Sequence, residues 1–318
     1  MEDQTIADEI EPHSPSRLER RLLAGHVVAT AELNPPRHAD GETVRGQARL
    51  LKGAVDAVNL TDCTRGVVRM SSTAAALLVR EEGVEPIVQM TCRDRNRIAL
   101  QSEVLGLSAL GLSNLLLLTG DDPTQGDHPD AKPVFDLNGT SLLAAAHRMR
   151  QDGVLLSGRG LPHRPRFFLG AAGDPERDLA QPERLALAEK VEAGVDFVQT
   201  QPVFDVERFS RWLDLVRAAG LHRRVAILAG VFLLDSARRA DFLRTVPGIV
   251  MPEAIQKRLS SAVDEQAEGI RVAIELCDAL VGLDGVRGVH LMGIDASAGI
   301  RSVIEGSSLA HHVARAGG

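Results

Sequence analysis

Short apolar runs alternate with longer amphipathic runs along most of the chain. The short runs are rich in β-branched residues, which is typical of strands, whereas apolar residues in the longer runs recur with a helical period. Strands are predicted at 27–33, 57–61, 86–92, 114–119, 166–172, 197–203, 226–232 and 289–294. Helices are predicted at 15–25, 40–53, 71–82, 96–111, 139–152, 182–193, 205–219, 234–245 and 253–283.

Eight predicted strands, each followed by a helix except the last, indicate a parallel sheet. Most of the strand runs lack strict polar alternation, as strands buried on both faces do. We therefore predict an α/β fold, a single (β/α)8 TIM barrel. A doubly wound open sheet is the alternative, but no Gly-x-Gly-x-x-Gly follows the first strand. Helix C-caps are predicted at Gly83, Gly111, Gly153, Gly194 and Gly220.

The domain organisation follows from the absence of any linker-like stretch. Residues 1–14 are polar with two prolines and are predicted to be a flexible segment, and residues 15–318 are predicted to form the barrel. Two long loops, 120–138 and 173–181, follow strands. Loops in that position lie on the catalytic face of a barrel, so both are expected to serve the site.

Composition narrows the class of protein. The chain has 318 residues, 44% hydrophobic and 25% charged, which suits a globular fold with a large core. A net charge of −7 argues against a nucleic-acid partner. No apolar run is long enough to span a membrane, and the acidic N-terminus is unlike a signal peptide, so cytoplasmic residence is expected. The three cysteines are too scattered for a disulfide framework or a structural zinc site.

Nearly every predicted strand ends in polar residues, which a barrel gathers at one mouth. Glu32 lies at the end of an apolar strand before two prolines. Desolvation there would raise its pKa and suit it to general acid catalysis. The alternative is a glutamate that caps the strand or forms an ion pair with a neighbour.

Asp121 and Asp122 follow the run LLLL, and we expect one to cap the turn and the other to face the mouth. His128 supplies no ligand spacing with them, so no metal is expected. Gln199 and Gln201 lie two apart on one side of a strand, where an amide can bind an amide-like heterocycle. Polar filling of the barrel is the alternative. No nucleophile motif or phosphate loop is present. These residues indicate a barrel enzyme for a small polar ligand, without identifying its reaction.

Residues 25–295 resemble the methylenetetrahydrofolate reductase family, and the matching motifs lie at the predicted strand ends. The resemblance rests on TAELNPPR (30–37), NLTD (59–62), MTCRDRNR (90–97), LLLLTGDDP (115–123), KPVFDL (132–137), QTQPVFDVERF (199–209) and GVRGVHLMGI (285–294). It implies a barrel that binds FAD non-covalently. NADH or NADPH would reduce the flavin, and hydride would pass to 5,10-methylenetetrahydrofolate to give 5-methyltetrahydrofolate. It further implies a homo-oligomer with small-molecule partners only, in the one-carbon metabolism that supplies methionine biosynthesis.

The resemblance also implies residue roles. Glu32 matches the family's catalytic acid, and Asp121 matches the aspartate that tunes the flavin and the substrate iminium. Gln201 matches a pterin-binding glutamine, Thr61 a threonine near the flavin ring, and Lys190 a basic residue near the flavin phosphates.

The flavin side departs from the family pattern. Among the predicted cofactor contacts, Gln89 replaces a histidine, Thr119-Gly120-Asp121 replaces Arg-Gly-Asp, and Phe135 stands for an adenine-side aromatic. Ala171 on the fifth strand and Glu183 after it are also predicted cofactor contacts, with Glu183 and Ala186 in place of an Asp and an Asn. Further departures are Ala229-Gly230-Val231 for Pro-Gly-Ile, and Leu291 and Met292 for aromatics. Two alternatives therefore stay open. One is a divergent barrel that uses another flavin, or none, on a related pterin substrate. The other is a folate-binding subunit without independent catalysis.

Overall fold

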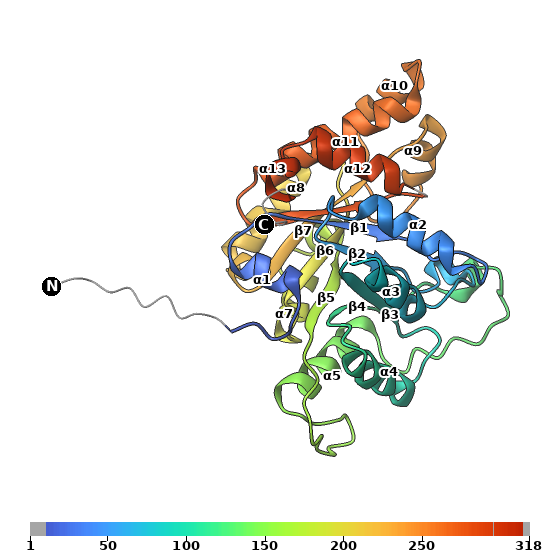
Figure 1. Cartoon of the computed structure of the whole chain (residues 1–318). Helices are drawn as coiled ribbons and strands as arrows, with labels where there is room; N and C mark the ends of the chain where they lie inside the picture. The colour runs from blue at the N-terminus through green and yellow to red at the C-terminus, as the bar shows by residue number, and fades with distance from the viewer. Residues whose placement is uncertain (1–10, 295, 314–318) are drawn as a thin grey trace.

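Eight parallel strands form a closed barrel in sequence order in the computed structural model, which describes residues 11–294 and 296–313. Each strand pairs with the next, and β8 pairs with β1 to close the ring. Figure 1 shows the strands at the centre with helices around them. The strands are β1 (Val28–Leu33), β2 (Ala57–Leu60), β3 (Pro86–Thr91), β4 (Asn114–Leu118), β5 (Phe168–Gly173), β6 (Phe197–Pro202), β7 (Ala226–Phe232) and β8 (Val286–Met292). The predicted barrel is confirmed.

The helices cover the outside of the barrel and one of its ends. They are α1 (Arg17–Leu23), α2 (Gly41–Leu51), α3 (Ser72–Glu81), α4 (Arg97–Ala109), α5 (Gly139–Gln151), α6 (Pro175–Ala180), α7 (Ala186–Glu192), α8 (Val206–Ala218), α9 (Ala237–Leu243), α10 (Glu253–Ser261), α11 (Glu265–Val281), α12 (Ser297–Gly306) and α13 (Leu309–Val313). Short 3-10 turns are η1 (Thr64–Gly66), η2 (Pro123–Gln125) and η3 (Leu221–Arg223). All five glycines predicted at helix C-caps have positive φ, between 67° and 90°.

Alternation along the strands separates two cores. Every second strand residue, such as Ala31, Val58 or Leu169, points outward and packs against the helices. The strand residues between them point inward, and at the N-terminal end of the barrel they form an apolar layer together with Leu18 and Leu22 of α1. That layer consists of Val28, Ala57, Ile87, Leu116, Phe168, Phe197 and Leu228. Because apolar side chains close this end, polar groups inside the barrel face the other end.

One glycine is required by the packing of the inner layer. A Cβ at Gly170 would lie 2.3 Å from Cζ of Phe197. The missing side chain leaves room for the Phe197 ring to stack on Phe168 with 4.8 Å between ring centroids. The stacked rings are the two largest side chains of this inner layer.

The segment after β5 differs from the prediction. The expected loop at 173–181 contains α6, and the helix predicted at 182–193 begins at Ala186. The buried carboxylate of Asp178 accepts a hydrogen bond from the backbone N–H of Ala186, 2.6 Å away. This tertiary contact caps α7 where the sequence offers no local capping side chain.

The C-terminal third also differs. The helix predicted at 253–283 is two helices, α10 and α11, because Asp264 begins a new helix by accepting from the N–H of Ala267. The last strand spans Val286–Met292 rather than 289–294, since its ladder with β7 starts at Val286. The last strand is followed by helices after all, α12 and α13.

Part of the predicted N-terminal segment is ordered. Residues 1–10 lie outside the described residues, but His13 and Ser14 both donate backbone hydrogen bonds to the Glu19 carboxylate of α1. The attached part of the chain therefore begins before residue 15. Among the described residues, no helix is long and apolar enough to cross a membrane.

Candidate active site

A cavity of about 600 Å³ opens at the carboxyl ends of the strands. Side chains from most of the strands and from the loops after them line it. Of the residues singled out in the sequence, the cavity is lined by Glu32, Gln89, Gly120, Asp121, Ala171, Lys190, Gln199 and Gln201. The barrel thus brings together residues that lie far apart in the sequence, as the strand-end pattern predicted.

Glu32 lies on β1 with its side chain about one-fifth exposed. Burial raises the pKa of this carboxyl group, and hydrogen bonds from Gln89 and Asn34 oppose that rise. The Gln89 amide nitrogen is 3.5 Å from Oε2 of Glu32. The group therefore keeps its proton to a higher pH than an exposed glutamate would.

His290 lies beside Glu32, and sequence reasoning missed it. Its Nε2 is 4.0 Å from Oε2 of Glu32, and its Nδ1 is 3.0 Å from Oγ1 of Thr30. Burial lowers the pKa of the imidazole to about 3, so the ring is neutral. The available signal was a histidine inside an otherwise apolar predicted strand. Its proximity to Glu32 follows from the β1–β8 register, which pairs Thr30 with His290.

Gln199 is buried, and its amide is already engaged. It accepts from Asn59 at 2.6 Å and donates back to Asn59 at 3.0 Å and to Thr30 at 3.1 Å. Gln199 therefore fills the polar interior of the barrel, the alternative weighed for it, and its contact with substrate stays a prediction.

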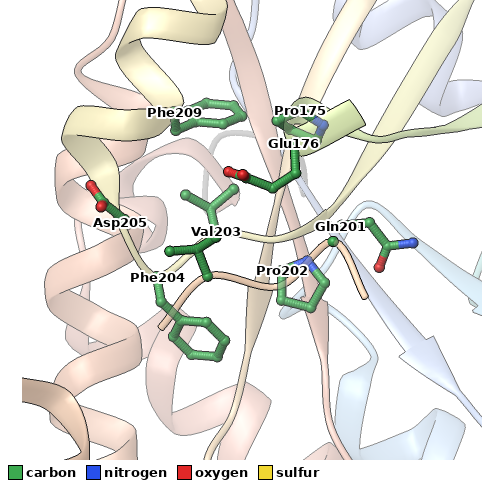
Figure 2. A pocket seen from close by; sticks show the side chains of 10 residues that line it. Pro175, Glu176, Gln201, Pro202, Val203, Phe204, Asp205 and Phe209 are labelled. Atoms are coloured by element: carbon green, nitrogen blue, oxygen red, sulfur yellow. The ribbon is translucent and has the colours of Figure 1, made fainter. Parts of the chain in front are cut away.

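Gln201 lies two residues further along β6 than Gln199, nearer the mouth of the barrel, and is half-buried. Besides lining the main cavity, it borders a small pocket of about 20 Å³ next to it. Figure 2 shows Gln201 and Pro202 at the end of β6, Val203 and Phe204 in the segment that follows it, and Glu176 of α6 nearby. Of the two glutamines, Gln201 is better placed to meet a ligand.

The two aspartates after β4 have the different positions expected for them, one capping a turn and the other facing the cavity. Asp122 caps η2 by accepting from the N–H and the hydroxyl of Thr124, at 2.9 and 2.7 Å. Asp121 lines the cavity, and its Oδ2 accepts from the backbone N–H of Arg65 at 2.6 Å. Gly120 has φ +93°, and a Cβ there would lie 2.9 Å from Cβ of Thr91, so the turn that aims Asp121 requires glycine.

A second cavity of about 420 Å³ adjoins the first. Thr119, Thr140, Arg177 and Lys190 line both. The shared wall includes the first turn of the 13-residue helix α5, a place where backbone N–H groups attract anions. Lys190 donates from Nζ to the carbonyl of Ala172, and burial lowers the pKa of its ammonium group.

Other predicted cofactor residues do not line these cavities. Phe135 is 38% exposed and has φ +40°, and Glu183 is exposed on the segment before α7. Thr61 is buried with its hydroxyl donated to the Asn34 amide oxygen, 3.0 Å away. Of the two residues in place of stacking aromatics, Met292 lines the cavity, whereas Leu291 is fully buried in the outer core. No cluster of three or more metal-ligating side chains occurs within residues 11–294 and 296–313.

The family model described as methylenetetrahydrofolate reductase matches residues 17–308. Methylenetetrahydrofolate reductase 1 of Schizosaccharomyces pombe is 23% identical over 257 residues, which are 77% of this chain and 38% of that protein. The 5,10-methylenetetrahydrofolate reductase of Pectobacterium carotovorum subsp. carotovorum is 22% identical over 276 residues, 84% of this chain and 86% of that protein. The chain thus spans less than half the length of the yeast and nematode relatives it matches.

A similar solved structure is described as an uncharacterized protein from Clostridium thermocellum that binds two copies of 5-methyl-5,6,7,8-tetrahydrofolic acid. The superposition has a TM-score of 0.66 at 14% identity and covers 91% of this chain and 98% of the other. A likeness at this identity concerns the fold alone.

Proposed function

The chain belongs to the methylenetetrahydrofolate reductase family, and from this premise we propose that it reduces 5,10-methylenetetrahydrofolate to 5-methyltetrahydrofolate. The observation that carries the proposal is the meeting of Glu32, Asp121 and Gln201 at one cavity. A proton donor, an anion and an amide are the groups that this chemistry needs. Their joint retention also argues against a folate-binding subunit without its own catalysis.

The residues present fit a non-covalently bound FAD. The two adjoining cavities share a wall that carries Lys190 and Arg177, whose cationic side chains suit phosphate groups. We propose that these groups hold the diphosphate and that Gln89 and Gly120 lie along the flavin. When bound, the flavin supplies the hydride, with NADH or NADPH as the electron donor.

Glu32 provides the proton in this proposal. The methylene bridge of the substrate opens to an iminium once a nitrogen next to it is protonated. A carboxyl group whose pKa is raised by burial carries that proton over a wider pH range than an exposed one. Asp121, fixed by the Arg65 N–H, offers a negative charge to the cationic iminium. Gln201 offers both a donor and an acceptor to the pterin.

The absorption spectrum of the purified chain and the mass of any released cofactor test this proposal. We expect a flavin spectrum that bleaches with NADH or NADPH and returns on addition of methylenetetrahydrofolate. The Glu32→Gln variant should keep the spectrum and its bleaching but lose folate turnover by about 10²–10⁴-fold. Glu207→Gln, at an exposed position on α8, is the matched control and should turn over normally. Normal turnover by Glu32→Gln would remove Glu32 from its assigned role.

A second candidate is a barrel that acts on a pterin with a different cofactor or none. The observation favouring it is that Phe135 and Glu183 lie away from the cavity walls, so two expected flavin contacts are missing. Active protein that releases no flavin would select this candidate. FAD recovered at about one equivalent would reject it.

A further inference from the structure

A row of polar side chains crosses the inside of the barrel below the cavity. The amides of Asn59 and Gln199 pair with each other, and Gln199 also donates to Oγ1 of Thr30. Thr30 in turn lies 3.0 Å from Nδ1 of His290, whose Nε2 faces Glu32. All of these side chains except that of Glu32 are buried. Side chains from β2, β6, β1 and β8 thus form one connected row that ends at the proposed acid.

The row constrains which nitrogen of His290 carries hydrogen. Gln199 uses one lone pair of the Thr30 hydroxyl, which has a single hydrogen to donate. The hydroxyl lies 3.0 Å from Nδ1 of His290 and 3.4 Å from the carbonyl of Val289, so Nδ1 either accepts from Thr30 or donates to its second lone pair. The Glu32 side favours the first arrangement, because Oε2 of Glu32 already accepts from Gln89 and the facing Nε2 of His290 then matches it as a second donor. A neutral ring with a bare Nδ1 carries its own hydrogen on Nε2, the atom that faces Glu32.

The Glu32 carboxyl group is consequently asymmetric. Gln89 donates to Oε2, and Nε2 of His290 faces the same oxygen at 4.0 Å, a separation that substrate binding can shorten. An oxygen surrounded by donors is the acceptor of a carboxylic acid, so the acidic hydrogen belongs on the other oxygen, Oε1. After Glu32 gives up that hydrogen, the same two donors stabilise the carboxylate left behind.

We propose that His290 is a positioning residue whose Nε2–H, fixed by Thr30, directs Oε2 of Glu32 and leaves the acidic proton on Oε1. In this assignment Gln199 also has a role, because its amide donates to Oγ1 of Thr30 and orients that hydroxyl group. The role in proton donation rests on the proposed reductase function, whereas the tautomer of His290 does not.

The tautomer is measured by long-range proton–nitrogen NMR on the full chain labelled with ¹⁵N-histidine. The chain has ten histidines, and loss of one signal set in His290→Gln assigns the resonances, with His26→Gln at an exposed position as control. We expect a neutral ring protonated on Nε2 throughout about pH 5–8. A ring protonated on Nδ1, or a charged ring in that range, overturns the proposal.

A second experiment separates positioning from mere structure. Thr30→Val removes the hydroxyl at nearly constant shape, so the His290 signals should shift towards the other tautomer. In folate turnover, kcat should fall by about tenfold or more with little change in KM, because the donor acts on the charge formed during reaction. Thr30→Ser restores the hydroxyl and should restore both the tautomer and kcat.

The outcomes of the two experiments are distinguishable. Full activity with an unchanged tautomer in Thr30→Val contradicts the positioning role. Failure of Thr30→Ser to recover while Thr30→Val folds normally also contradicts it. Absence of any folate turnover in the wild-type chain overturns the proposed function instead, and the NMR result still decides the tautomer.

Discussion

At the scale of single residues, the floor of the cavity is a set of polar groups held in an apolar barrel. Burial acts in opposite directions on its two titratable members, raising the pKa of Glu32 and lowering that of His290. Both shifts favour the uncharged form, as a low dielectric requires. Burial therefore makes the charged form of each group more costly, unless a reaction or a ligand places an opposite charge beside it.

This burial of Glu32 has a consequence for stability. Its folded-state pKa lies above the ordinary value of 4.5, so between these two pKa values the folded chain binds more protons than the unfolded chain. The stability that the protonated Glu32 carboxyl group contributes at low pH is then lost as the pH rises through the folded-state pKa. Glu32→Gln has no such loss, so we expect it to be more stable than wild type above this window and equal to it below about pH 4.5.

Urea unfolding midpoints across pH measure this difference. Glu207→Gln, at the exposed position on α8, should show no pH-dependent difference from wild type. A Glu32→Gln variant that is less stable than wild type at neutral pH would mean that the carboxylate is stabilised where it lies.

At the scale of elements, Asp178 ties three helices together. It lies on α6 with 1% exposure, caps α7 through the Ala186 N–H, and accepts from Nε1 of Trp212 on α8 at 3.0 Å. Helix α7 carries Lys190 to the cavity wall. The start of α7, and with it the position of this lysine, therefore depends on a carboxylate eight residues earlier.

Asp178→Ala should lower the free energy of unfolding by about 2–5 kcal/mol, since it leaves two buried donors unpaired. Trp212→Phe removes only the indole donor together with some packing and serves as the partial comparison. Equilibrium urea unfolding gives both values. A loss below about 1 kcal/mol for Asp178→Ala would show that water or another group replaces the carboxylate.

At the scale of the whole molecule, the barrel has one sealed end and one open end. Helix α1 lays Leu18 and Leu22 against the inner apolar layer at the N-terminal end. The cavity and its polar residues occupy the opposite end. Stability and chemistry are therefore carried by different ends of the same strands, as in other barrels of this kind.

Leu22→Ala should cost about 2–5 kcal/mol of stability, because it opens a void under the barrel. Leu23→Ala, at a neighbouring position that is 44% exposed, should change stability by less than about 0.5 kcal/mol. Thermal or urea unfolding compares the two. Folate turnover per folded molecule should be unchanged in both, and a large loss of kcat in Leu22→Ala would show that the two ends are coupled.

The sequence by itself determined the barrel and the end that holds the site. Strand and helix periods are local properties, and strand ends rich in polar residues converge by the geometry of any parallel barrel. For that reason the strand pattern alone could place Glu32, Asp121 and Gln201 at the mouth of the barrel, where they line the cavity. The break before α11 was missed because the helical pattern continues across its cap, Asp264. The start of α7 was missed because its cap is a tertiary contact from Asp178.

Only the tertiary structure decided which polar groups meet inside the barrel. Gln199 pairs with Asn59 from 140 residues away, and Thr30 meets His290 from 260 residues away. These contacts depend on the registers of all eight strands and on closure of β8 onto β1, which no local period encodes. The same closure makes His290, a residue that the sequence pattern did not single out, the neighbour of the proposed acid.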